Sequence, residues 1–113
     1  MLKMLIKIDE ERLVKDDRYD LDDYWESIDF RFKDNCTKEV LPDGSVLYGG
    51  IEGADYFNEI SAAYIVLSRK EWFAQYVTKW IWYENLSIKG QPLSSINLLE
   101  KQRAQNPIFQ KIS

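Results

Sequence analysis

Apolar residues alternate with lysines over residues 2–8, on a spacing close to two residues. This period is typical of a strand with one face buried and the other in solvent. Two further short runs, residues 37–41 and 45–49, flank a Pro-Asp-Gly sequence at 42–44. Proline and glycine at these positions favour a tight reversal, so the two runs are predicted to form a β-hairpin.

The spacing of apolar residues changes to three and four residues after Asp20. Residues at this spacing share one face of a helix, which is predicted over 21–34. Asp20 is suited to cap the helix, because its carboxylate can accept a hydrogen bond from a backbone N–H of the first turn. The polar residues 9–19 before it are expected to form a loop or a short exposed turn of helix.

Residues 60–67 are apolar at nearly every position, which fits a central strand as well as the end of a buried helix. Ser68 and Glu71 have the spacing of a capping box, so a helix is expected to begin there. The apolar positions that follow predict a helix over 69–84. A strand that leads directly into a capped helix is common, which favours a strand for 60–67.

A last helix is expected over 95–105, ended by the Asn-Pro pair at 106–107. These elements predict an α+β fold, in which a small antiparallel sheet packs against helices in a single domain over 1–113. The expected strands are 2–8, 37–41, 45–49 and 60–67, and the expected helices are 21–34, 69–84 and 95–105.

The net charge of −4 conceals a division within the chain. Residues 1–59 carry 16 acidic and 8 basic side chains, whereas residues 60–113 carry 3 acidic and 7 basic ones. Ten carboxylates fall between Asp9 and Asp29, against only three basic side chains. Such a segment attracts basic surfaces and repels phosphate backbones, so direct binding of nucleic acid is not expected.

Histidine is absent and Cys36 is the only cysteine. Nucleophilic sites that need a histidine base are therefore excluded, as is a zinc site of the usual nitrogen and sulfur type. The aspartates of residues 16–23 lack the glycine and the closing glutamate of a calcium loop. No metal or cofactor is expected, and carboxylate-dependent hydrolysis is the enzymatic alternative that remains.

A protein-binding surface is the favoured interpretation of the acidic segment. Asp22, Glu26 and Asp29 are spaced by four and three residues, which places them in one stripe opposite the apolar face of the predicted helix. An ordinary solvated helix face is the competing interpretation. In the second predicted helix, Trp82 projects from the side opposite the apolar face. It is therefore either an exposed anchor for a partner or is covered by the C-terminal segment. The candidate partner-binding residues are Asp16, Asp17, Tyr19, Asp22, Asp23, Glu26, Asp29 and Trp82.

In size, acidity and its acid-rich, aromatic face, the chain resembles bacterial immunity proteins of contact-dependent inhibition and polymorphic toxin systems. The resemblance rests on residues 16–29, namely Asp16, Asp17, Asp20, Asp22, Asp23, Glu26 and Asp29 with Tyr19, Tyr24 and Trp25. It implies a non-catalytic cytoplasmic inhibitor that binds a basic, nuclease-type toxin domain and occludes its active or substrate-binding surface.

A cytoplasmic location also fits the single cysteine and the early acidic residues, which interrupt any signal-like start. No sufficiently long apolar run suggests a membrane span. The second functional class is a structural or regulatory accessory protein that oligomerises through its aromatic segment. A carboxylate enzyme is the third class.

Overall fold

Strand β1 is the centre of a five-stranded antiparallel sheet with the order β2-β3-β1-β4-β5. The computed structural model describes residues 2–32, 36–50, 56–86 and 92–110 of the chain. The β-α-β-β-α-β order of the first four strands is that of the split βαβ, or ferredoxin-like, arrangement, to which β5 is added. The predicted α+β class is therefore confirmed. The strands are β1 (Lys3–Ile8), β2 (Cys36–Val40), β3 (Val46–Gly50), β4 (Val77–Leu86) and β5 (Pro92–Asn97).

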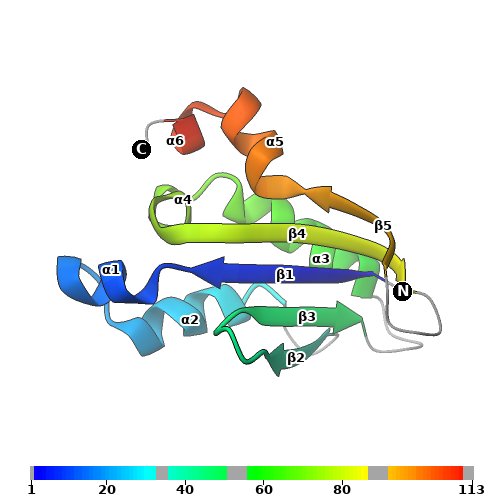
Figure 1. Ribbon diagram of the computed structural model, residues 1–113, viewed down its shortest axis with the longest axis horizontal. Helices are drawn as coiled ribbons and strands as arrows, with labels where there is room; N and C mark the ends of the chain where they lie inside the picture. Colours follow the sequence, from blue (N-terminus) through cyan, green and yellow to red (C-terminus); the bar gives the residue numbers. More distant parts are fainter. Residues whose placement is uncertain (1, 33–35, 51–55, 87–91, 111–113) are drawn as a thin grey trace.

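The two faces of the sheet differ because side chains alternate along each strand. Met4 and Ile6 of β1 are fully buried, whereas Lys3 and Lys7 are only half-buried. The lysines point to the other face, which we call the open face. In Figure 1 the strands lie in front of helix α3 (Tyr56–Leu67), and the viewer looks onto this open face.

The helices bury their apolar side chains with the inner face of the sheet in one core. Trp80 of β4 is fully buried and contacts Phe73 and Phe109, with ring centroids 4.9 and 5.9 Å away. Phe32 stacks on Tyr48 of β3 at 3.8 Å. The other helices are α1 (Glu10–Asp16), α2 (Leu21–Asp29), α4 (Glu71–Tyr76), α5 (Leu98–Gln105) and α6 (Pro107–Gln110).

The predicted first strand and hairpin are confirmed as β1 and the β2–β3 pair. The turn between β2 and β3 depends on Gly44, whose φ of 87° is readily adopted only by glycine. Asp43 adds side-chain hydrogen bonds to the backbone N–H and the hydroxyl of Ser45. These contacts explain why the sequence at 42–44 reverses the chain.

The strand expected over 60–67 is wrong, because this segment forms the last two thirds of α3. Ile60, Ala63 and Leu67 are buried at spacings of three and four residues, and Ile65 is exposed between them. The helix covers the inner face of the sheet. Its many apolar residues concealed this period in the sequence.

The helix expected over 69–84 is also wrong beyond its first turns, because α4 ends at Tyr76 and β4 follows without a loop. Trp80 lies opposite Ile6 in the β1–β4 pairing. The expected capping box does not form: Lys70 is the N-cap of α4 without a side-chain bond, and the Ser68 hydroxyl donates to the Ile65 carbonyl of α3. Pairing with the central strand outweighs the helical spacing of the apolar residues.

The expected helix over 95–105 is correct only in its second part. Residues up to Asn97 form β5, and the Asn97 side chain then caps α5 by accepting from the Glu100 N–H at 3.1 Å. Asn106 ends α5, as the Asn-Pro pair predicts. The helix expected over 21–34 ends as α2 at Asp29, and its last two positions lie outside the described residues.

Candidate protein-binding surface

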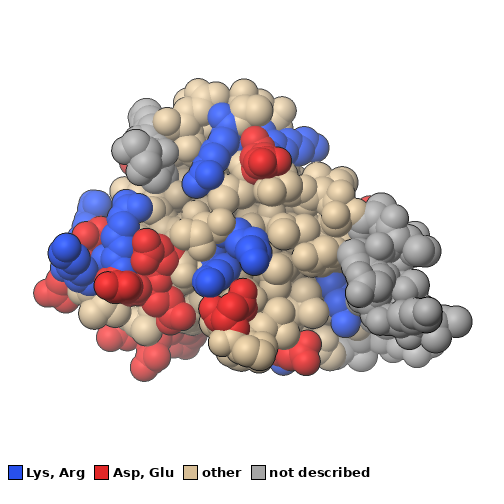
Figure 2. Space-filling view, viewed as in Figure 1, with Lys and Arg blue, Asp and Glu red and all other residues tan. Residues whose placement is uncertain are grey.

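Acidic side chains gather at the end of the molecule that α1 and α2 form, as Figure 2 shows. Both helices begin at an aspartate: Asp9 accepts from the Arg12 N–H at 3.0 Å, and Asp20 accepts from the Asp23 N–H at 3.1 Å. Such caps satisfy backbone donors that the first turn leaves unpaired. The predicted cap at Asp20 is confirmed. We call this surface the acidic end.

Helix α2 carries its carboxylates on the side that faces solvent. Tyr24 and Ile28 are buried, whereas Asp22, Asp23 and Glu26 are exposed. Among the described residues, no lysine or arginine nitrogen lies within ion-pair distance of these three carboxylates. Their negative charge is therefore available to a partner.

Asp29 belongs to the predicted stripe, but its carboxylate is occupied within the fold. Its Oδ1 accepts from the Tyr48 hydroxyl at 2.5 Å, and its Oδ2 lies 2.7 Å from the Lys38 Nζ. Burial, followed by the hydrogen bond to Asp29, raises the pKa of Tyr48, so this phenol remains a neutral donor. Asp29 attaches α2 to the sheet and contributes little free charge.

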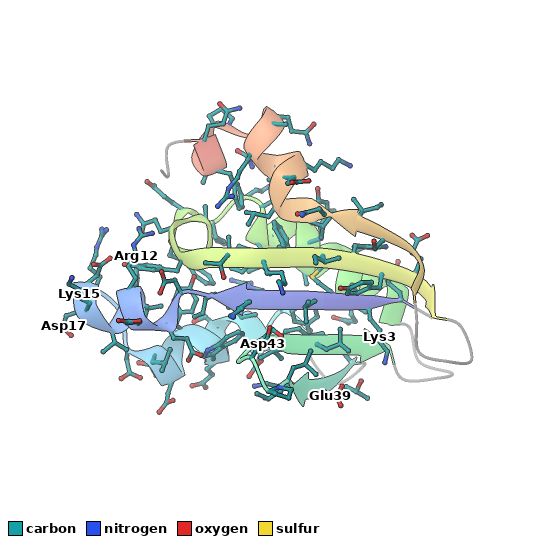
Figure 3. The ribbon with its side chains drawn as sticks, in the orientation of Figure 1. Lys3, Arg12, Lys15, Asp17, Glu39 and Asp43 are labelled. Carbon is teal, nitrogen blue, oxygen red and sulfur yellow. The ribbon has the colours of Figure 1, made fainter. Side chains whose placement is uncertain are left out.

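Asp16 and Asp17, at the end of α1, also differ from each other. Asp16 accepts from the Tyr76 hydroxyl at 2.9 Å and lies 3.7 Å from the Arg12 Nε, so it joins α1 to α4. Burial and the hydrogen bond to Asp16 raise the pKa of Tyr76. Asp17 ends α1 in the left-handed conformation, with a φ of 52°, and its side chain is exposed. Figure 3 shows Asp17 at the outer limit of the acidic end, near Arg12 and Lys15.

The two aromatic candidates lie in different surroundings. Tyr19 is 39% exposed at the acidic end, where its ring meets the edges of the Tyr24 and Tyr76 rings. Trp82 lies on β4, half-buried on the helix side of the sheet, where its ring meets Tyr64 at 6.2 Å. Its indole N–H donates to Glu84. The structure therefore does not bring Trp82 together with the acidic candidates.

Phe30 is an exposed aromatic residue that sequence reasoning missed. It is 65% exposed at the end of α2, beside a shallow hollow that it shares with Asp23, Glu26 and Arg31, whose Cζ lies 5.7 Å from the centre of the Phe30 ring. The available signal was its position, two residues from both Ile28 and Phe32, which turns it away from the apolar face of the helix. An exposed ring beside carboxylates is suited to anchor a protein partner.

The open face of the sheet is a second surface, and its character is different. Leu5 of β1 lies between Leu47 of β3 and Ile81 of β4. At one end of this apolar row, Asp43 lies 4.0 Å from the Lys7 Nζ and 3.9 Å from the Lys79 Nζ. Figure 3 shows Lys3, Asp43 and Glu39 around this face.

Asp43 is a strongly hydrogen-bonded carboxylate at the margin of the open face. The Ser45 hydroxyl and then the Ser45 N–H lower its pKa, and Lys7 and Lys79 lower it further. This aspartate therefore remains ionised in acid where an ordinary one takes up a proton. It stabilises the β2–β3 turn through Ser45 and pairs with Lys7 and Lys79.

Within the described part of the chain, no group of three or more acidic or cysteine side chains is arranged to hold a metal ion. A helix of sufficient length and apolarity to cross a membrane is likewise not found among these residues.

Comparison with known proteins identifies no relative: neither a family model, nor a curated protein, nor a solved structure matches the chain.

Proposed function

We propose that this chain is a non-catalytic binding protein whose acidic end docks on a basic surface of another protein. The observation that carries the proposal is the exposed, unneutralised set of carboxylates on one side of α2, next to the exposed ring of Phe30. Charge of one sign accelerates encounter with an oppositely charged partner, and a buried aromatic side chain then slows dissociation.

The fold itself supports a rigid docking surface. The Tyr48–Asp29–Lys38 contacts fix α2 to the sheet, and the Arg12–Asp16–Tyr76 contacts fix α1 to α4. A surface held in this way loses little conformational entropy on binding, which favours affinity. The helix backbone that carries the exposed carboxylates therefore keeps its position when a partner approaches.

The narrower proposal is that the partner is a nuclease-type toxin domain and that the chain is its cytoplasmic immunity protein. A nuclease surface that binds phosphates must be basic, so an acidic protein can occupy it in place of the nucleic acid. This proposal takes up the resemblance in size, acidity and aromatic content to bacterial immunity proteins. It requires no catalytic group in the chain.

Charge reversal on α2 tests the proposal. The test needs a cognate toxin domain, sought among the products of neighbouring genes, as the binding partner. Affinity and association rate are measured at salt concentrations from about 50 to about 500 mM, over which the screening length of the charges falls about threefold. The double variant Asp22→Lys/Glu26→Lys should bind at least about tenfold more weakly and lose protection of cells that express the toxin. Asp29 is left unchanged because its loss would disturb the fold.

The matched control is Glu39→Lys/Glu100→Lys, which changes the net charge equally at two exposed sites away from the acidic end. Affinity should stay close to that of the unchanged protein. Equal weakening by both double variants would show that only overall charge matters, which would contradict docking at α2.

Sedimentation of the protein alone tests the second functional class. An oligomer insensitive to salt, with no binding to the toxin domain, would identify a self-assembling accessory protein and would overturn the proposal. A monomer that forms a stable heterodimer supports it.

A further inference from the structure

A hollow of about 320 Å³ lies between the start of α2 and the start of α4, at the acidic end. This volume lies at the lower end of the range for ligand pockets, roughly 300–1,000 Å³, so the hollow can admit one long side chain. Its lining combines aromatic rings with charged groups. The residues that line it are Arg18, Tyr19, Asp20, Asp23, Tyr24, Ser27 and Trp72.

The aromatic walls are held in place before any ligand arrives. The Tyr24 ring meets Trp72 edge-on at 5.1 Å and Tyr19 at 6.1 Å. The Tyr24 hydroxyl donates to the backbone carbonyl of Trp72 at 2.9 Å, which joins α2 to α4 at the hollow. Aromatic faces attract a cation placed within about 6 Å of the ring centre.

A guanidinium group of the chain itself already binds to the neighbouring ring of this aromatic cluster. The Arg12 Cζ lies 5.1 Å from the centre of the Tyr76 ring, and Tyr76 lies 5.9 Å from Tyr24. The Arg12 Nε also lies 3.7 Å from Asp16. An aromatic ring and an aspartate thus bind one arginine beside the hollow, and the hollow offers the same two kinds of group.

The charges at the hollow favour a cation. Asp20 gives one oxygen to the cap of α2, which leaves its other oxygen available, and Asp23 receives no side-chain hydrogen bond from a described residue. Ser27 donates to the Asp23 backbone carbonyl and so leaves its carboxylate available. Among the described residues that line the hollow, Arg18 is the only positive one, so two carboxylates outweigh one guanidinium there.

We propose that this hollow receives one arginine side chain of the protein partner, with the guanidinium between the aromatic rings and the Asp20 and Asp23 carboxylates. The inference rests on the proposed function and names the group by which the partner is recognised. Arginine suits the site better than lysine, because its flat guanidinium stacks on rings and can pair with a carboxylate through two N–H groups.

Titration with N-acetyl-L-argininamide, followed by amide and indole NMR shifts, tests the site on the intact protein. We expect shifts confined to Tyr19, Asp20, Asp23 and the indole N–H of Trp72, with a dissociation constant on the order of 1–10 mM for so small a ligand. N-acetyl-L-citrullinamide, the uncharged analogue of similar shape, should produce no such shifts. The lysine analogue should bind at least about threefold more weakly.

Three variants separate the hollow from the general field of the acidic end. Asp20→Asn/Asp23→Asn should weaken binding at least about fivefold, and it retains the cap of α2 because asparagine caps as well as aspartate. Asp22→Asn/Glu26→Gln makes the same change of charge on α2, and it should weaken binding by no more than about twofold, because neither side chain lines the hollow. Arg18→Gln should tighten binding, because it removes the competing positive charge.

The inference is overturned if argininamide causes no NMR shifts at the residues of the hollow. It is also overturned if citrullinamide or the lysine analogue binds as tightly as argininamide, or if both double variants weaken the binding of argininamide equally. Failure of the proposed function gives a different result. In that case argininamide still binds, but the affinity for the toxin domain does not respond to charge reversal at Asp22 and Glu26.

Discussion

Removal of the Tyr48 hydroxyl tests whether Asp29 serves to attach the acidic helix to the sheet. The substitution Tyr48→Phe keeps the ring that stacks on Phe32 at 3.8 Å and removes only the O–H that donates to Asp29. The hydroxyl lies in the interior, since Tyr48 is 2% exposed. The change therefore isolates one hydrogen bond to a carboxylate.

The expected loss of stability follows from the surroundings of this bond. A hydrogen bond to a charged group contributes about 1.5–3 kcal/mol. Asp29 keeps its contact with Lys38, and its side chain is 35% exposed, so water can replace part of the lost bond. We therefore expect a loss near the lower limit, about 1.5 kcal/mol, which lowers the Tm of a domain of this size by roughly 6 °C.

Urea unfolding followed by tryptophan fluorescence and circular dichroism measures this loss. Tyr83→Phe is the matched control, because the Tyr83 hydroxyl makes no hydrogen bond with a described residue; its effect should stay within about 0.5 kcal/mol. In a cycle with Asp29→Asn, the two changes should be non-additive by at least about 0.5 kcal/mol. Unchanged stability of Tyr48→Phe, or strict additivity, would refute the assigned role of Asp29.

Three further predictions concern the turn, the core and the cysteine. Hydrogen bonds from Ser45 lower the pKa of Asp43 in the folded state. The ionised Asp43 carboxylate therefore contributes its full stabilisation above the ordinary aspartate pKa, and this stabilisation is lost as the pH falls through the lowered pKa of the folded state. Asp43→Asn should therefore reduce the slope of stability against pH below about pH 4, measured by thermal unfolding. Trp80→Ala should destabilise the fold by about 3–5 kcal/mol in urea, and the half-buried Trp82→Ala by less; equal losses would contradict the strand pattern. Burial raises the pKa of the Cys36 thiol to about 11, so iodoacetamide should alkylate it at pH 7.5 about 100-fold more slowly than a free thiol. An ordinary rate would disprove this burial.

The sequence patterns that predicted the fold correctly were those with a single physical interpretation. The alternating lysines of residues 2–8 fit only a half-buried strand, and the Pro-Asp-Gly turn fits only a reversal. Spacing assigns residues 77–83 wrongly to a helix, because their apolar positions continue the helical pattern of α4. Their β-branched and aromatic composition favoured the strand, but it is pairing with β1 that determines it.

The candidate site was predictable in location and less so in detail. The capped helix with Asp22, Asp23 and Glu26 on its solvent side follows from spacing alone. The internal contacts of Asp16 and Asp29 depend on tyrosines 60 and 19 residues away along the chain. Local periodicity has no information about such distant partners.

Both neighbours of strand β1 come from far along the chain, since Leu5 lies opposite Leu47 and Ile81. Each edge of the central strand must therefore wait for a long loop to close before it is hydrogen-bonded, which slows refolding. During this wait its unpaired edges can add to another molecule. Recovery of the native protein from urea should therefore improve as the protein is diluted.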